Sequence, residues 1–192
     1  MKRNILMIVL MVISLFSTSA KAQNDTDFKP THNVIKLNYG PGLVYSEMRE
    51  LNNIYKTSSS YDLSVDYCHT FNKGLGFGVN VIQSHLNAIC SNDFYAGASV
   101  YYAKELKNGW YFDASLGLGY AGNDYDAVEG GVGVFEQIGA HYKFARHFGV
   151  GAELRSLSCS YRTQLERSRI YSFEGSFGTN RIALTIGLQY YF

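Results

Sequence analysis

The sequence predicts an all-β fold, a closed eight-stranded antiparallel up-and-down transmembrane β-barrel with short periplasmic turns and longer extracellular loops. Three observations support this prediction. Apolar and polar residues alternate through eight separate segments, which is typical of strands with one apolar and one polar face. The connections between these segments are alternately short and long, as in transmembrane barrels. The polar face carries glycine and charged residues, which cannot form the apolar core of a soluble protein.

The first 22 residues have the features of a targeting segment. Lys2 and Arg3 precede an apolar run over residues 5–16, and small residues lead to Ala22. This arrangement predicts a cleaved secretory signal peptide, because the run is too short to span a bilayer as a helix. No cysteine follows the small residues, so we expect no lipoprotein processing. The predicted organisation is a signal peptide (1–22), a short periplasmic segment (23–32) and an outer-membrane barrel (33–192).

The eight alternating segments are the expected strands. They are residues 34–45, 60–71, 75–86, 94–106, 110–121, 132–144, 148–160 and 181–192. In that order, their apolar series include Ile35/Leu37/Tyr39, Tyr61/Leu63/Val65, Leu75/Phe77/Val79, Phe94/Ala96/Ala98, Trp110/Phe112/Ala114, Val132/Val134/Ile138, Phe148/Val150/Ala152 and Ile182/Leu184/Ile186. Each series occupies every second position, so each segment presents one apolar face.

The connections assign the two ends of the barrel. Three-residue turns are expected at 72–74, 107–109 and 145–147, two of which end in the glycine that such turns favour. Longer loops are expected at 46–59, 87–93, 122–131 and 161–180. Pro41 is an exception inside the first strand, because proline removes a ladder donor and a closed barrel has no free edge. We expect a bulge or bend there.

The glycines indicate which face points inward. Most of the 19 glycines fall on the polar face, where small residues leave room in a narrow lumen for larger polar side chains. The aliphatic and aromatic face then contacts lipid. Aromatic residues form two groups: Phe71, Trp110, Tyr142, Phe144, Phe148, Tyr190 and Phe192 near the short turns, and Tyr45, Tyr61, Phe94 and Tyr120 near the long loops.

The last strand, residues 182–192, alternates apolar residues and ends in an aromatic residue. With the preceding pattern, it resembles the small eight-stranded outer-membrane barrels of the OmpA/OmpX type. The resemblance implies a Gram-negative outer membrane, periplasmic termini, and contact with outer-membrane lipid and lipopolysaccharide. It also implies that Tyr190 and Phe192 belong to the signal read by the barrel-assembly machinery. It implies no single activity.

Charged residues on the predicted inward face form the main candidate site. These are Lys36, Asp62, Asp66, Glu105, Asp113, His141, Lys143, Glu153, Arg155 and Arg181. Buried charges must be paired, so we favour an ion-pair and hydrogen-bond network that plugs the lumen. The alternative is a narrow porin-like channel through rearranging pairs.

A lipid A-modifying enzyme is the less favoured alternative. Such a hydrolase needs serine, histidine and a carboxylate close together on the lipid-facing surface. Glu136, Ser156 and Ser158 fall on adjacent strands, but His85 falls across the barrel, and the chain has no His-x-Ser motif. We therefore expect no enzymatic activity.

The last long connection is a candidate contact surface. Arg162, Arg167 and Arg169 could pair with lipopolysaccharide phosphates, and Tyr171 and Phe173 could contact an extracellular protein. A β-ribbon without a ligand is an equally good interpretation.

The remaining expectations concern partners and cofactors. The near-neutral charge argues against nucleic-acid binding. The histidines lack ligand spacing, so we expect no metal and no cofactor. Free thiols are favoured over a Cys90–Cys159 disulfide. The expected protein is a monomeric barrel with a structural or surface-interaction role.

Overall fold

The computed structural model describes residues 32–48, 54–71, 74–87, 91–106, 109–124, 128–167 and 171–192. The predicted signal peptide, residues 1–22, lies outside this part. The described chain forms eight strands: β1 (Asn33–Met48), β2 (Ile54–Thr70), β3 (Leu75–Leu86), β4 (Ser91–Glu105), β5 (Trp110–Asn123), β6 (Val128–Lys143), β7 (Phe148–Arg167) and β8 (Tyr171–Tyr191).

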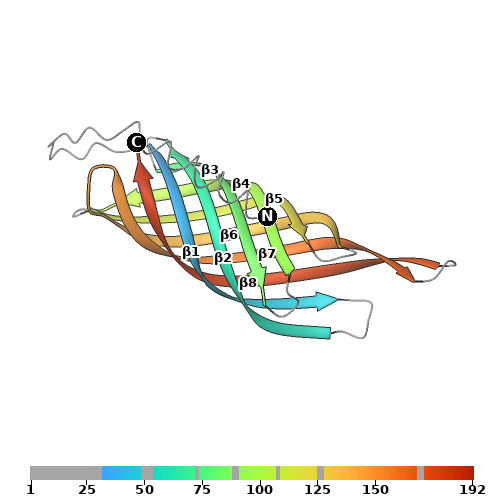
Figure 1. The fold of residues 1–192 in the computed structure, drawn as a ribbon. Helices are drawn as coiled ribbons and strands as arrows, with labels where there is room; N and C mark the ends of the chain where they lie inside the picture. Colours follow the sequence, from blue (N-terminus) through green and yellow to red (C-terminus); the bar gives the residue numbers. More distant parts are fainter. Residues whose placement is uncertain are drawn as a thin grey trace, which may run out of the picture.

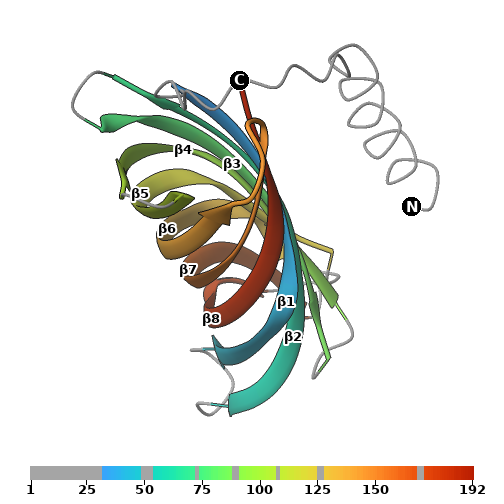
Figure 2. The same cartoon turned by 90° about the vertical axis from the view of Figure 1, so that its left-hand side faces the viewer.

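These strands form a closed barrel in chain order, with β8 pairing back to β1, and every pair is antiparallel (Figure 1, Figure 2). The predicted fold class is thereby confirmed. Cross-strand partners can be followed once around the barrel from Leu37 through Val65, Val81, Ala96, Tyr120, Val132, Ser160 and Gly178 to Glu47. The path returns to β1 ten residues beyond its start. Such a stagger tilts the strands about 35–45° from the barrel axis.

The two faces follow the predicted alternation. On β1, Lys36 and Asn38 are buried inside the barrel, whereas Leu37 and Tyr39 are 40% and 58% exposed outside. The same contrast holds on β8, where Arg181 and Thr185 are buried and Ile186 is 67% exposed. An exterior of large apolar side chains around a polar interior is the reverse of a soluble protein, and it is the arrangement that lipid requires.

Short connections join the strands at one end, which we call the turn end. Gly74 and Gly109 have φ angles of 81° and 79°, in the left-handed region that glycine adopts readily. The C-terminus lies at this end, because the Tyr191 amide donates to the His147 carbonyl in the turn after β6. The predicted short turns are therefore confirmed.

The opposite end, which we call the ribbon end, differs from expectation. Residues 46–59 were expected to form a loop, and residues 161–180 either a loop that contacts a partner or a β-ribbon. In the structure, β1 pairs with β2 out to Met48↔Ile54, and β7 pairs with β8 out to Arg167↔Tyr171. Figure 1 shows this β7–β8 ribbon extending away from the barrel, at the end opposite the C-terminus. The β-ribbon interpretation of residues 161–180 agrees with this pairing, whereas the loop expected at 46–59 is shorter than predicted because backbone pairing continues after apolar alternation stops.

Of the bulge or bend expected at Pro41, a bulge is not present. Pro41 pairs with Tyr61 on β2, but the β1–β8 ladder skips it and Gly40 between Tyr39↔Ile186 and Gly42↔Ala183. Both strands advance by three residues there, so the ladder is interrupted without a change of register. A β-carbon at Gly40 would lie 2.6 Å from the Thr185 Cα, so the backbones approach closely beside the proline. The register shift in the barrel lies between β6 and β7, at Val128 and Gly131.

Two outward aromatic groups mark the barrel wall. The turn-end belt consists of Phe71, Trp110, Tyr142, Phe144, Phe148, Tyr190 and Phe192, and the ribbon-end belt consists of Tyr45, Tyr61, Phe94 and Tyr120. Neighbours in the turn-end belt contact one another, with ring centroids 5.6 Å apart for Trp110–Tyr142 and 5.3 Å apart for Phe148–Tyr190. No helix in the described part of the chain is long and apolar enough to cross a membrane.

Candidate functional site in the charged lumen

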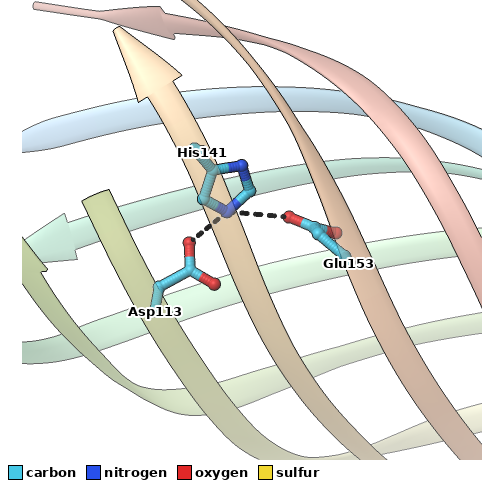
Figure 3. A group of neighbouring side chains, drawn as sticks. All are labelled: Asp113, His141 and Glu153. Atoms are coloured by element: carbon cyan, nitrogen blue, oxygen red, sulfur yellow. Dashed lines mark ion pairs between the residues drawn. The ribbon is translucent and has the colours of Figure 1, made fainter. Parts of the chain in front are cut away.

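Four side chains from four strands meet inside the barrel. Lys36 on β1 forms ion pairs with Asp113 on β5 and with Glu153 on β7, the latter at 3.1 Å from Nζ to Oε1. The His141 Nε2 atom on β6 lies 2.9 Å from the Asp113 Oδ2 and 3.7 Å from the Glu153 Oε1, as Figure 3 shows. All four side chains are buried, so the group links opposite walls of the barrel.

Arg155 extends this group toward β2. Its Nη2 lies 2.5 Å from the Asp66 Oδ2, and its guanidinium also donates to Glu153 and to the Ser64 hydroxyl. Asn38 and Asn80 donate to the two Asp66 oxygens at 3.1 and 2.9 Å. We call the set Lys36, Asp66, Asp113, His141, Glu153 and Arg155 the lumen network.

Glycines next to His141 make room for its ring. A β-carbon at Gly139 would lie 2.5 Å from the His141 Nε2 and 2.7 Å from an Asp113 oxygen. A β-carbon at Gly151, the cross-strand partner of His141, would collide with the imidazole and lie 2.6 Å from the Ala140 carbonyl oxygen. Inward glycines are therefore needed to fit the network into so narrow a barrel.

The charged side chains of this site neutralise one another. Three carboxylates face two permanent cations, Lys36 and Arg155, with His141 as the remaining titratable group. Asp113, His141 and Glu153 offer ligand atoms within 4.8 Å of one another, as a metal ion would need. However, the Lys36 ammonium contacts the same two carboxylate oxygens as His141. The lysine thus takes the place that a bound cation would occupy.

An apolar layer lies next to the network, and the sequence interpretation missed it. Ile82, Tyr95, Phe135, Leu157 and Tyr161 are buried with Ala121 and Cys159 in one cluster. The Tyr95 and Phe135 rings stack with centroids 5.9 Å apart, and the Arg155 guanidinium lies 6.0 Å from the Phe135 ring. The sequence could have predicted this layer, because its apolar residues occupy positions of the alternation that face inward. They were overlooked because inward positions were assumed to be polar.

Two further pairs occupy the ends of the lumen. Toward the ribbon end, the Arg181 Nη1 donates to the Asp93 Oδ2 at 2.7 Å, and the Thr179 hydroxyl donates to the same oxygen at 3.2 Å. Asp93 was not among the predicted residues. At the turn end, the Lys143 ammonium lies 4.8 Å from the centroid of the Tyr191 ring. Asp62 is buried and accepts a hydrogen bond from Ser60 at 3.4 Å.

Glu105 is the exception among the predicted lumen residues. It is exposed at the end of β4, whereas Tyr101 and Ala103, earlier inward positions of the same strand, are buried. Its assignment to the buried network was wrong, because alternation gives the side of a strand but not the point where the wall meets solvent.

The structure places part of the predicted contact surface. Arg162, Arg167, Tyr171 and Phe173 lie on the paired β7–β8 ribbon, where Arg167 is opposite Tyr171 and Phe173 is opposite Leu165. Arg169 lies outside the described residues. Tyr190 and Phe192 lie at the end of the chain in the turn-end belt, with ring centroids 5.8 Å apart.

The residues considered for a hydrolase do not converge. Glu136 is opposite Ser156 on the outer face of β6 and β7, and Ser158 is the next outward residue. His85 is on β3 and hydrogen-bonds to Asn92 on β4 at 3.0 Å, while the imidazole of His141 points into the lumen. Cys68 and Cys159 are buried free thiols, and Cys90 lies outside the described residues.

Closed barrel topology, an apolar exterior with two aromatic belts and a charged interior define the class of small eight-stranded outer-membrane β-barrels. Solved structures that share the fold include the following two. The outer membrane protein OprG from Pseudomonas aeruginosa matches 84% of this chain and 96% of its own, with TM-score 0.56 and 11% identity. Neisserial surface protein A (NspA) matches 82% and 97%, with TM-score 0.55 and 13% identity. No protein-family model and no curated protein sequence matches the chain.

Proposed function

We propose that this protein is an integral outer-membrane barrel with a structural or surface-interaction role, whose lumen is closed by its own side chains. The observation that carries the proposal is the lumen network together with the apolar layer beside it. Lys36 on β1 bridges Glu153 on β7 and Asp113 on the opposite strand β5, and the Tyr95–Phe135 stack lies in the same interior. The outer membrane as its location, reached after cleavage near Ala22, is part of the same proposal.

Ion conduction tests the closed lumen. The mature protein, reconstituted in planar bilayers, is expected to give no conductance above that of the lipid. A variant with Phe135→Ala and Arg155→Ala removes the aromatic stack and one side of the network, so it serves as the control that a current would be detected. Stepwise conductance of the unmodified protein would instead support the narrow porin-like channel.

The surface role rests on the two hairpins that extend beyond the barrel. From Ser158, near the level of the ribbon-end belt, β7 continues for nine residues to Arg167, which corresponds to about 30 Å of strand. Outer-membrane lipid, lipopolysaccharide or an extracellular protein would be met there first. Cell-surface binding by a strain whose β7–β8 ribbon is trimmed to a short turn tests this role, and unchanged binding of every ligand tried would refute it.

A non-enzymatic role is also part of the proposal. The separation of His85 from Glu136 and the serines supports it, because a serine hydrolase requires its base within hydrogen-bonding distance of the nucleophile. Mass spectrometry of lipid A from cells with and without the gene should show the same acyl chains. A difference restored by the wild-type protein but not by Ser156→Ala would refute this conclusion.

A further inference from the structure

A carboxylate lies on the outward face of the barrel, between apolar residues. Glu136 on β6 is exposed, and its outward neighbours on the same strand, Val134 and Ile138, are 38% and 59% exposed. Its cross-strand partner on β5 is Leu116, which is 58% exposed, and its partner on β7 is Ser156. An ionisable group at such a position is costly in a bilayer unless it has a polar partner.

Strand positions place this carboxylate well within the apolar wall. Glu136 is six residues along β6 from Tyr142 of the turn-end belt, about 15 Å at the tilt of such strands. It is four residues, about 10 Å, from Val132, and Val132 is opposite Tyr120 of the ribbon-end belt. Within the described part of the chain, no hydrogen bond or ion pair to the Glu136 carboxylate is present. A polar partner from another molecule would offset this cost.

The ribbon-end belt has no member on β6, β7 or β8, the strands on and beside this carboxylate. Its members lie on β1, β2, β4 and β5. On β7 and β8, the outward positions toward the same end carry Ser156, Ser158, Ser160 and Asn180. Hydroxyl and amide groups there offer hydrogen-bond donors instead of aromatic rings. The outward surface of β6 to β8 thus combines one acceptor with several donors.

We propose that the outward face of β6 and β7 is an interface with a second copy of this chain in the membrane. A two-fold axis along the membrane normal, placed outside the barrel in front of these two strands, would set β6 of one copy against β7 of the other. Glu136 and Ser156 are direct cross-strand partners, so at this tilt their heights in the membrane differ by only about 3 Å, which a glutamate side chain can span. The axis therefore brings each Glu136 carboxylate opposite the Ser156 hydroxyl of the other copy, and forms two equivalent hydrogen bonds.

The rest of this face suits the same contact. Below the polar pair, Ile138 is opposite Leu154, and Ala140 is opposite Ala152. Small side chains near the axis let two surfaces approach closely, as they do between membrane helices. A self-complementary patch that carries both donor and acceptor is what an isologous interface requires. A lipid acyl chain offers neither, so a second copy is favoured over lipid as the occupant, and the expectation of a monomer is set aside.

The experiment uses the mature chain in vesicles of phosphatidylcholine without lipopolysaccharide, with Cys68, Cys90 and Cys159 replaced by serine. Ala152→Cys, near the axis, is treated with a short bifunctional maleimide. Val79→Cys on β3 is the matched control, because it is also outward and 48% exposed but lies across the barrel. We expect cross-linked dimers from Ala152→Cys and only monomers from Val79→Cys.

Energy transfer between donor- and acceptor-labelled copies then measures the association. Glu136→Leu should raise the dissociation constant about tenfold or more, since two hydrogen bonds are lost per dimer. Ser156→Ala, which removes the other partner of the same bonds, should act in the same direction. Gln83→Leu, an outward polar residue on β3, should leave association unchanged.

Three results would overturn the proposal: no dimer in these vesicles, equal cross-linking from Val79→Cys, or unchanged association of both the Glu136 and Ser156 variants. Association that occurs only when lipopolysaccharide is added would also overturn it, because lipid would then be the direct occupant of the face.

Discussion

Replacing Arg155 by methionine tests the lumen network most directly. The guanidinium is buried among Asp66, Glu153 and Ser64. Methionine fills much of the same space but supplies neither charge nor donors. Three buried carboxylates would then face Lys36 as the single permanent cation of the network. The expected result is a large loss of stability with the barrel topology retained.

The magnitude follows from the burial of the pair. Removing one partner of a buried ion pair leaves an uncompensated charge in a low dielectric, which costs about 3–5 kcal/mol. Urea unfolding in lipid vesicles measures this loss, and Trp110 provides the signal because it is the only tryptophan in the chain. It lies 47% exposed in the turn-end belt, so its fluorescence reports transfer from lipid to water.

Two further variants make the measurement decisive. Arg146→Met removes an exposed arginine from the turn after β6 and should leave the free energy of unfolding nearly unchanged. Asp66→Asn, added to Arg155→Met, removes one unpaired carboxylate and should recover about 1–3 kcal/mol. A loss below about 1 kcal/mol for Arg155→Met, which is the range of an exposed ion pair, would refute the inference that the network closes and stabilises the lumen.

Three other predictions follow from the same interior. Gly151→Ala should destabilise the barrel by about 1–3 kcal/mol through overpacking, because its β-carbon would lie 2.6 Å from a backbone carbonyl oxygen; Gly178→Ala, whose nearest atom would be 3.6 Å away, is the matched control in the same urea titration. Lys36→Ala should create a zinc site from the imidazole and carboxylates that the lysine contacts, so zinc at 100 times its Kd should stabilise this variant by about 2.7 kcal/mol and leave the wild type unchanged. Cys68 and Cys159, both buried, should react with a maleimide only after unfolding, as peptide mass spectrometry would show; labelling in the folded barrel at the rate of a free thiol would contradict their placement.

The wall of the barrel could be predicted from the sequence because it depends on a local rule. A side chain at every second position faces the same way, so Leu37 and Ile186 could be assigned to the outside without knowing their neighbours. The ends of the strands could not be predicted in this way. Backbone pairing continues out to Met48 on β1 and to Arg167 on β7, where the side chains no longer alternate.

The partners inside the lumen could not be predicted, because they depend on the closure of the barrel. Lys36 and Asp113 are 77 residues apart in sequence and come from strands on opposite walls. Their contact requires the ten-residue stagger and the length of a lysine side chain together. Glu105 follows the same alternation as Tyr101, yet it emerges into solvent because β4 ends there. Alternation identifies which residues face inward, but the pairs that they form depend on the register between strands in the closed barrel.

Strand β6 shows why the exposed carboxylate is a property of the fold and not an error of register. Phe135 points into the lumen and Glu136 points outward, so both run against the simple pattern. A slip by one residue would reverse both, but it would also turn every other side chain of the strand to the opposite face. Val134 and Ile138 would enter the lumen, and His141 would leave its carboxylate partners for the lipid. Phe135 is held inside by its stack on Tyr95, and His141 by Asp113. The register that satisfies the interior therefore forces Glu136 outward, where the proposed contact with a second copy would give it a polar partner.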